Sequence, residues 1–283
     1  MQMTVKEFFK LFSSDDVCLE HLFNARFGQG HECNKCGRSA KWYRIANRPV
    51  YSCQWCGNHV HPRAGTLFED SRTSLQSWFY AIYLFTVTRH GVSAKEIQRQ
   101  LGVTYKTAWR MGHEIRKHMA AVDGDDSLGG IVEVDEVMIG GVRPGKRGRG
   151  AAGKTVVFGM MERGGDIMTQ VVPNVRRATL QPIIQENVEA GAEIHSDELL
   201  SYRSLESQGY DHKTVNHGSG QYVSGNVHVN GLEGFWSHLQ KSIHGTHIHV
   251  SGKHLDKYTK EFEYRFNYRH QPERMILDLL SKF

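Results

Sequence analysis

The stretch IVEVDEVMI (131–139) predicts a β-strand, because β-branched residues dominate it and glycine pairs flank it on both sides. The chain after it predicts two further strands, 155–161 and 166–172, which are joined by a hairpin turn at residues 163–165. The elements that follow are a helix (179–190), a short strand (193–197), a helix (199–208), a strand (212–217) and two helices (229–243 and from 253).

Two carboxylates stand at defined places in this element order. Asp135 lies on the first strand, and Asp197 lies at the end of the fourth. Three strands followed by alternating helices and strands, with carboxylates at these two places, is the layout of a ribonuclease-H-like α/β domain. We therefore expect residues 131–283 to form such a domain.

The helix expected at 229–243 carries further polar groups. Successive residues of a helix advance by about 100°, so one face collects Asn230, Glu233, Ser237 and Lys241. The opposite face is apolar and is expected to pack on the sheet; it comprises Leu232, Phe235, Trp236, Leu239 and Ile243. The polar face suits a site for metal and phosphate, although an ordinary solvated face has the same periodicity.

Four of the five cysteines form two pairs, Cys33/Cys36 and Cys53/Cys56, with sixteen residues between the pairs. This is the spacing of a four-thiolate zinc site, and the glycine after each pair fits a knuckle turn. Because no secretory signal precedes the pairs, zinc is favoured over disulfides. We expect residues 1–72 to hold an amphipathic helix pair (1–25) and a zinc ribbon with one structural Zn²⁺.

Residues 73–120 predict a helix-turn-helix domain. An apolar helix (73–90) comes first, and Ser93 with Glu96 has the pattern of a capping box at the start of the next helix. Residues 102–104 predict a short turn, and a second helix follows over 105–119.

In a helix-turn-helix motif the second helix enters the major groove of DNA. This geometry makes Lys106, Thr107 and Arg110 the expected DNA-contacting residues. A plain helical hairpin with a solvated basic face has the same sequence pattern.

A second basic segment follows the first strand of the C-terminal domain. It is rich in glycine, cannot pack a core and suits a loop that contacts phosphates, although a solvated hairpin loop fits equally well. Its expected DNA-binding residues are Arg143, Lys146, Arg147 and Arg149. Residues 121–130 are acidic, polar and rich in glycine, and they predict a linker between the domains.

The composition agrees with a multidomain α+β protein. The chain has 283 residues, of which 39% are hydrophobic, and its net charge of +5 permits a polyanionic partner. The longest apolar run, 79–85, is far shorter than the roughly 20 residues that a membrane-spanning helix needs. The N-terminal segment lacks the layout of a signal peptide, so we expect a cytoplasmic protein.

With these motifs the chain resembles the IS1595 family of insertion-sequence transposases, also called ISXO2-like, from about residue 15 to residue 270. The resemblance rests on the ribbon cysteines and on VDE (134–136) with Gly140-Gly141, HSD (195–197), HVNGLEGFW (228–236) and FEYRFNYR (262–269). It implies a DDE-type catalytic domain with two Mg²⁺ or Mn²⁺ ions that cuts transposon ends and joins them to target DNA.

The resemblance also implies roles for single residues. Asp135 matches the first acidic position and would bridge both ions, and Asp197 matches the second. The third position stays open between Asn230 and Glu233, because family members are described with either Asn or Glu there, followed by a lysine. Charge favours Glu233, since Mg²⁺ prefers anionic oxygen, and Lys241 would contact a DNA phosphate.

The expected partners are double-stranded DNA, both terminal repeats and target, and further copies of the chain in a homodimer or higher oligomer on DNA. The family implies a bacterial, nucleoid-associated protein. Two alternatives use the same fold: a structure-specific DNA nuclease without strand transfer, and a DNA-binding regulator. The presence of Asp135, Asp197 and Glu233 argues against the regulator, because a protein that no longer cuts DNA does not need to keep its catalytic acids.

Overall fold

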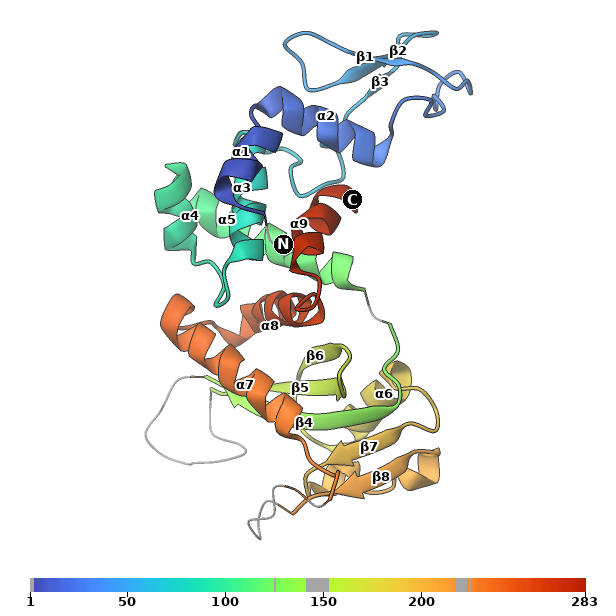
Figure 1. Ribbon diagram of the computed structural model, residues 1–283, viewed down its shortest axis with the longest axis vertical. Helices are drawn as coiled ribbons and strands as arrows, with labels where there is room; N and C mark the ends of the chain where they lie inside the picture. Colours follow the sequence, from blue (N-terminus) through green and yellow to red (C-terminus); the bar gives the residue numbers. More distant parts are fainter. Residues whose placement is uncertain (1–2, 125, 141–152, 217–222, 224) are drawn as a thin grey trace. The chain divides into compact units, whose positions relative to one another are not determined.

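The computed structural model describes residues 3–124, 126–140, 153–216, 223 and 225–283 (Figure 1). The chain divides into two units. The first comprises residues 1–122 together with 270–283, and the second comprises residues 123–269.

The first unit begins with two helices and a small sheet. Helices α1 (Val5–Leu11) and α2 (Asp15–Arg26) form the expected helix pair. Strands β1 (Trp42–Arg44), β2 (Tyr51–Cys53) and β3 (His59–Val60) follow as an antiparallel sheet in the order β1-β2-β3. The central strand β2 ends at Cys53, the first residue of the second cysteine pair.

Three further helices follow: α3 (Leu75–Val87), α4 (Ala94–Leu101) and α5 (Tyr105–Asp123). Ser93 caps α4, because its hydroxyl accepts a hydrogen bond from the backbone N–H of Glu96 at 3.1 Å. Gly102 has φ +65°, so the chain turns sharply between α4 and α5. The inward-facing stripe of α5 is fully buried and consists of Ala108, Met111, Ile115 and Met119.

The last helix, α9 (Pro272–Ser281), belongs to the first unit, whereas residues 270–283 were expected to be part of the C-terminal domain. Two backbone carbonyls of α9 pair with histidine rings: Leu280 with Nε2 of His21 at 3.0 Å, and Leu279 with Nε2 of His118 at 2.8 Å. The buried apolar stripe of α9 completes this core.

The second unit is built on a five-stranded mixed sheet. Its strands are β4 (Ile131–Ile139), β5 (Thr155–Glu162), β6 (Ile167–Val172), β7 (Glu193–Ser196) and β8 (Asp211–Thr214), and their order is β6-β5-β4-β7-β8. The pairs β4/β5 and β5/β6 are antiparallel, whereas β4/β7 and β7/β8 are parallel. The five predicted strands are therefore confirmed, and β4 has the predicted bounds.

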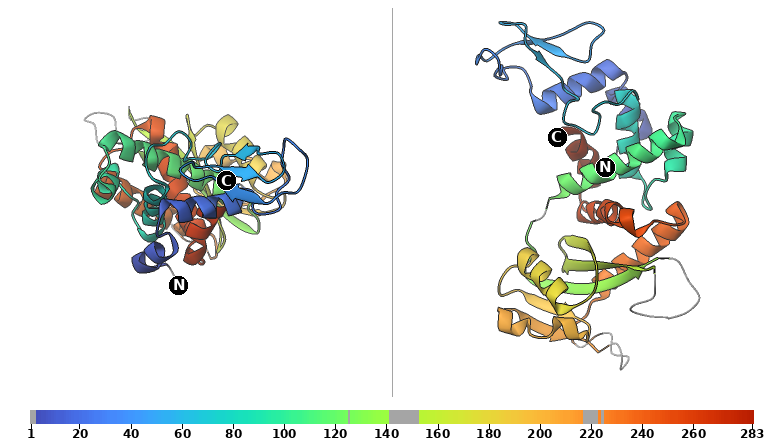
Figure 2. Two further views of the ribbon diagram at one scale, coloured as in Figure 1. Left: turned by 90° about the horizontal axis from the view of Figure 1, so that it is seen from above. Right: turned by 180° about the vertical axis from the view of Figure 1, so that it is seen from behind.

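Helices cover both faces of this sheet (Figures 1 and 2). On one face α6 (Arg177–Asn187) packs on the even-numbered side chains of β4, such as Val132 and Val134. On the other face lie α7 (Asn230–Ser242), which continues as a π-helical turn (Ile243–His247), and α8 (Gly252–Asn267). Because side chains alternate along a strand, Glu133 and Asp135 face α7.

The helix expected over 199–208 is wrong. The chain there forms two short 3₁₀ turns, Leu200–Tyr202 and Glu206–Gln208, separated by Ser204 with φ +78°. A left-handed residue cannot continue an α-helix, and the buried Tyr202 ring anchors the irregular segment in the core instead.

Candidate functional site

The four ribbon cysteines meet at one point. Their sulfur atoms all lie within 4.8 Å of one another; Cys33 and Cys56 are 3.6 Å apart, and Cys36 and Cys53 are 4.0 Å apart. Four sulfurs placed tetrahedrally about 2.3 Å from a zinc ion stand about 3.8 Å from one another. None of these cysteines forms a disulfide, so the group can hold one zinc ion, as predicted.

The turns after the cysteine pairs explain why glycine is needed there. Gly37 and Gly57 have φ +64° and +70°, and their N–H groups donate to the carbonyl oxygens of Cys33 and Cys53 at 2.8 and 3.0 Å. The fifth cysteine, Cys18, is fully buried on α2, and burial raises the pKa of its thiol to about 12. It behaves as a small apolar side chain.

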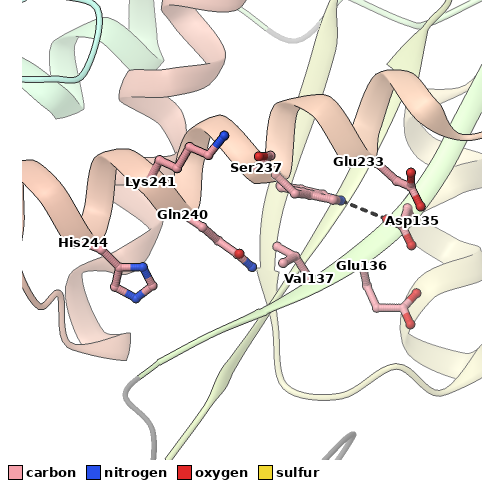
Figure 3. Close-up of a pocket in the computed structure, with 9 residues that line it drawn as sticks. Asp135, Glu136, Val137, Glu233, Ser237, Gln240, Lys241 and His244 are labelled. Atoms are coloured by element: carbon pink, nitrogen blue, oxygen red, sulfur yellow. Dashed lines mark hydrogen bonds between the residues drawn. The ribbon is translucent and has the colours of Figure 1, made fainter.

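The first acidic residue of the candidate active site, Asp135, is held on β4 beneath α7. The indole Nε1–H of Trp236 donates a hydrogen bond to its Oδ2 at 3.1 Å (Figure 3). Burial, then the charge of Glu136 and that of Asp197, raise the pKa of Asp135 to about 7. The negative charge at this position is therefore poorly compensated by the protein itself.

The second acidic residue, Asp197, directly follows β7. The parallel register pairs Glu133 with His195, so its continuation brings Asp197 level with Asp135 on the same face of the sheet. Asp197 is only 8% exposed, and its Oδ1 accepts a hydrogen bond from the backbone N–H of Leu199 at 2.9 Å. That turn holds the carboxylate at the end of the strand.

A pocket of about 620 Å³ lies between β4 and α7. Figure 3 shows Glu233 beside Asp135, with Lys241 and His244 farther along the helix. The full lining comprises Asp135, Glu136, Val137, Glu233, Trp236, Ser237, Gln240, Lys241 and His244. The pocket is acidic where β4 passes under Glu233 and basic towards the end of α7.

The expected amphipathic division of α7 is confirmed. Its predicted apolar face is buried against the sheet: Leu232, Phe235, Trp236, Leu239 and Ile243. Of the predicted polar face, Glu233, Ser237 and Lys241 line the pocket. Asn230, the first residue of α7, is exposed and does not line it.

The acids are neighbours but do not converge as the cysteines do. Among the described residues, the four-cysteine group is the one whose metal-binding atoms all lie within 4.8 Å of one another, and Asp135, Asp197 and Glu233 do not form such a group. Their carboxylates would have to approach one another to share ions.

Several residues at the site escaped the sequence analysis. Tyr202 donates a hydrogen bond to Oε2 of Glu136 at 2.7 Å, and burial with the nearby acids raises the pKa of Tyr202 well above its usual value, so it remains a donor. Glu133 is 2% exposed and accepts two hydrogen bonds from the start of α7. The sequence held one signal for a role of Glu133, namely that it is an acidic residue in a buried strand, two positions before Asp135.

The expected DNA-contacting residues of α5 lie near its start. Lys106 and Arg110 are exposed. Thr107 is half-buried, and its hydroxyl lies 3.0 Å from that of Thr104, whose Oγ1 also accepts from the N–H of Thr107. The expected phosphate contacts Arg143, Lys146, Arg147 and Arg149 lie outside the described residues.

Comparisons with known proteins match both parts of the chain. The family model of the ISXO2-like transposase domain matches residues 127–267, and that of the transposase zinc-ribbon domain matches residues 13–59. A protein in transposable element ISH50 of Halobacterium salinarum is 27% identical over 95% of this chain and 96% of its own length. A transposase-like protein of Haemophilus influenzae is 35% identical over 36% of this chain and 80% of its own length.

Among the helices in the described part of the chain, none is both long enough and apolar enough to cross a membrane.

Proposed function

The chain belongs to the ISXO2-like transposases of the IS1595 family, and from this premise we propose that it cuts the ends of its insertion sequence and joins them to target DNA. The catalytic unit is proposed to be a ribonuclease-H-like domain of the DDE type. The strand order β6-β5-β4-β7-β8, which is third, second, first, fourth and fifth strand of the unit, supports this assignment. The observation that carries the proposal is the acidic pocket between β4 and α7.

Asp135, Asp197 and Glu233 are the proposed ligands of two Mg²⁺ or Mn²⁺ ions. The donor set fits, because hard carboxylate oxygens are what these ions prefer and because the pKa of Asp135 is raised by poorly compensated negative charge. Bound there, the ions would supply an activated water and stabilise the leaving oxygen. Glu233 is preferred over Asn230, since Glu233 lines the pocket with Asp135 and Asn230 does not.

The protein's own groups position the acids and the DNA. The indole of Trp236 donates a hydrogen bond to one oxygen of Asp135 and so holds the carboxylate on the pocket side of β4. Lys241, two turns along α7 from Glu233, is proposed to pair with a DNA phosphate. Asn230 at the start of α7 is proposed to orient a water molecule.

The proposed reaction has two steps. Water adds to the phosphorus at the transposon end, the bond from phosphorus to the 3′ oxygen breaks, and a proton converts that oxygen to a free 3′-OH. The 3′-OH then attacks a phosphodiester of the target, forming one bond from phosphorus to oxygen as another breaks. Neither step needs a covalent intermediate with the protein.

The first unit is proposed to recognise the transposon ends. Helix α5, in a helix-turn-helix with α4, would contact base edges through Lys106, Thr107 and Arg110, beside the zinc ribbon. The segment with Arg143, Lys146, Arg147 and Arg149 would add affinity that depends on salt but not on sequence. Copies of the chain are proposed to pair on DNA, because two ends must be joined.

The test uses duplex DNA that carries the two termini flanking the gene, with Mg²⁺ or Mn²⁺. Wild-type protein should release 3′-OH ends and join a preprocessed end to plasmid DNA. Asp135→Asn and Asp197→Asn should bind the ends normally but neither cut nor join them. Cutting without joining would instead identify a structure-specific nuclease, and specific binding without cutting in any metal would identify a regulator.

Recognition is tested separately with Arg110→Ala. Loss of a base contact should cost about 1–3 kcal/mol of end binding and relax specificity at one position. Unchanged affinities for both end DNA and random DNA would refute the recognition role of α5.

A further inference from the structure

The start of α7 is held by a side chain from a distant strand. Helix α7 has no side-chain cap of its own at Val229. Instead, Oε2 of Glu133 accepts hydrogen bonds from the backbone N–H groups of Gly231 and Leu232 at 2.8 and 3.2 Å. A carboxylate at a helix N-terminus satisfies N–H groups that have no partner within the helix and interacts favourably with the helix dipole.

This contact needs glycine at position 231. A Cβ there would lie 2.8 Å from Oε2 of Glu133 and 2.8 Å from Sδ of Met161. Gly231 therefore lets the backbone of α7 approach β4 closely, which explains the first of the two glycines in the motif at 228–236.

Arg163, in the turn between β5 and β6, joins this cap to its surroundings. Its Nε and Nη2 donate to Oε1 of Glu133 at 3.3 and 3.1 Å. Its guanidinium also donates to the carbonyl oxygens of Asn226 at 2.9 Å and His228 at 3.2 Å, just before α7. One guanidinium therefore binds both the strand and the segment that enters the helix.

The third element in contact with Arg163 is β7. Nη2 of Arg163 lies 3.0 Å from Nδ1 of His195, whose Nε2 lies 2.6 Å from Oε1 of Glu193. Since a guanidinium only donates, Nδ1 of His195 accepts the hydrogen bond from Arg163, and the Nε2–H group donates a hydrogen bond to Oε1 of Glu193. His195 is fully buried, so its ring has a fixed position in β7.

These contacts have one property in common. Glu133 stands two residues before Asp135, His195 two before Asp197, and Gly231 two before Glu233. Glu133, His195 and Gly231 thus each lie on the element that carries or leads directly into one proposed ligand. Glu133 and His195 also face the same side of the sheet as the ligand that follows them, because side chains two residues apart on a strand point the same way. The cluster of Glu133, Arg163 and His195 connects the three ligand-bearing elements.

We propose that Arg163, with Glu133 and His195, positions the three carboxylates of the active site; the inference rests on the proposed function above. Replacing a buried ion pair with apolar groups is often neutral for stability, so the cluster is not explained by stability alone. Supporting groups of this kind alter metal affinity or activity by about 10- to 100-fold when they are removed.

The test compares wild type with Arg163→Ala, Arg163→Lys and Glu133→Gln, and uses Arg177→Ala as a matched control, because Arg177 is an exposed arginine on α6. Hydrogen exchange of residues 226–235 is measured by mass spectrometry in protein without added Mg²⁺ or Mn²⁺. Cleavage of end DNA is measured over a metal titration and over a DNA titration.

Arg163→Ala should accelerate exchange at the start of α7, raise the metal concentration for half-maximal cleavage by about 10-fold or more, and leave the affinity for end DNA unchanged. Arg163→Lys should restore part of both effects, because one ion pair with Glu133 remains. Glu133→Gln should show the same changes as Arg163→Ala. If Arg163→Ala does not fold, the exchange and metal titration of Glu133→Gln test the inference in its place. Arg177→Ala should match wild type.

A lower melting temperature in Arg163→Ala, with unchanged exchange at α7 and an unchanged metal titration, would show a merely structural role and overturn the inference. The exchange measurement does not depend on catalysis. An inactive wild-type protein would therefore overturn the proposed function, while the exchange data would still decide whether the cluster holds α7.

Discussion

Gly159→Ala adds one methyl group directly beneath the candidate active site. Gly159 lies on β5 opposite Asp135, and a Cβ there would lie 2.5 Å from Cζ2 and 2.7 Å from Cη2 of Trp236. Ordinary contacts begin at 3.4 Å, so the indole would have to retreat by about 1 Å. Leu232, at 3.1 Å, limits the directions in which α7 can move.

Two magnitudes follow from this geometry. Overpacking a close-packed core costs about 1–3 kcal/mol, which for a unit of this size lowers the melting temperature by about 2–12 °C. The same retreat lengthens the 3.1 Å hydrogen bond from Trp236 to Asp135 beyond bonding distance. If that bond, worth about 1.5–3 kcal/mol to a charged group, is needed in the transition state, its loss slows cleavage by about 10- to 160-fold.

Thermal unfolding and end cleavage are measured on Gly159→Ala, Trp236→Phe and Gly234→Ala. Trp236→Phe removes the donor without adding the methyl, so it should slow cleavage with a smaller loss of stability. Gly234→Ala adds the same group on α7 where nothing lies within 4 Å, and it should stabilise the helix by up to about 1 kcal/mol. Wild-type melting and cleavage in Gly159→Ala would refute the packing of Trp236 on β5 and its link to Asp135.

Three further experiments address the acids and the ribbon. The folded-state pKa of Asp135, about 7, exceeds the usual value of 3.8 for an aspartate, so the folded state binds more protons between these pH values. In Mg²⁺-free buffer the free energy of unfolding of wild type relative to Asp135→Asn should therefore fall as pH rises from about 4 to 7. A difference that stays flat or rises in denaturant titrations over this range would contradict the buried, uncompensated carboxylate. Elemental analysis should find one zinc per chain. After the zinc is removed with a chelator, iodoacetamide should label Cys33, Cys36, Cys53 and Cys56 but not the buried Cys18. Labelling of all four ribbon thiols before chelation would argue against the zinc site. Glu233→Gln should abolish cleavage across a metal titration, whereas Asn230→Ala should retain part of it; normal cleavage by Glu233→Gln with a dead Asn230→Ala would assign the third position to Asn230.

The sequence was sufficient for features that depend on short-range periodicity. The bounds of β4, the buried face of α7 and the positive φ of Gly37 and Gly57 all follow from local patterns that tertiary contacts did not override. The cysteine spacing was equally informative, because a metal ion restricts the four sulfurs to one geometry.

Contacts between distant segments could not be predicted in this way. Glu133 and Gly231 are far apart in the sequence, and nothing local to either shows that one caps the helix of the other. The same holds for Gly159, whose lack of a side chain matters only because Trp236 occupies the space. The irregular segment at 199–208 was missed because its polar and apolar residues allow a helix, whereas burial of Tyr202 holds a different backbone.

Because α9 belongs to the first unit, that unit cannot complete its fold until the end of the chain has been synthesised. Residues 1–122 leave the ribosome early, but the helix that fills their core begins only at Pro272. At about 5–20 residues per second, roughly 150 intervening residues delay that helix by about 8–30 s. During this interval, in which residues 123–269 are themselves being synthesised, the rings of His21 and His118 have no carbonyl oxygen of α9 to pair with. The unit that we propose to recognise DNA can therefore be completed only after every residue of the unit that we propose to cut it has been synthesised.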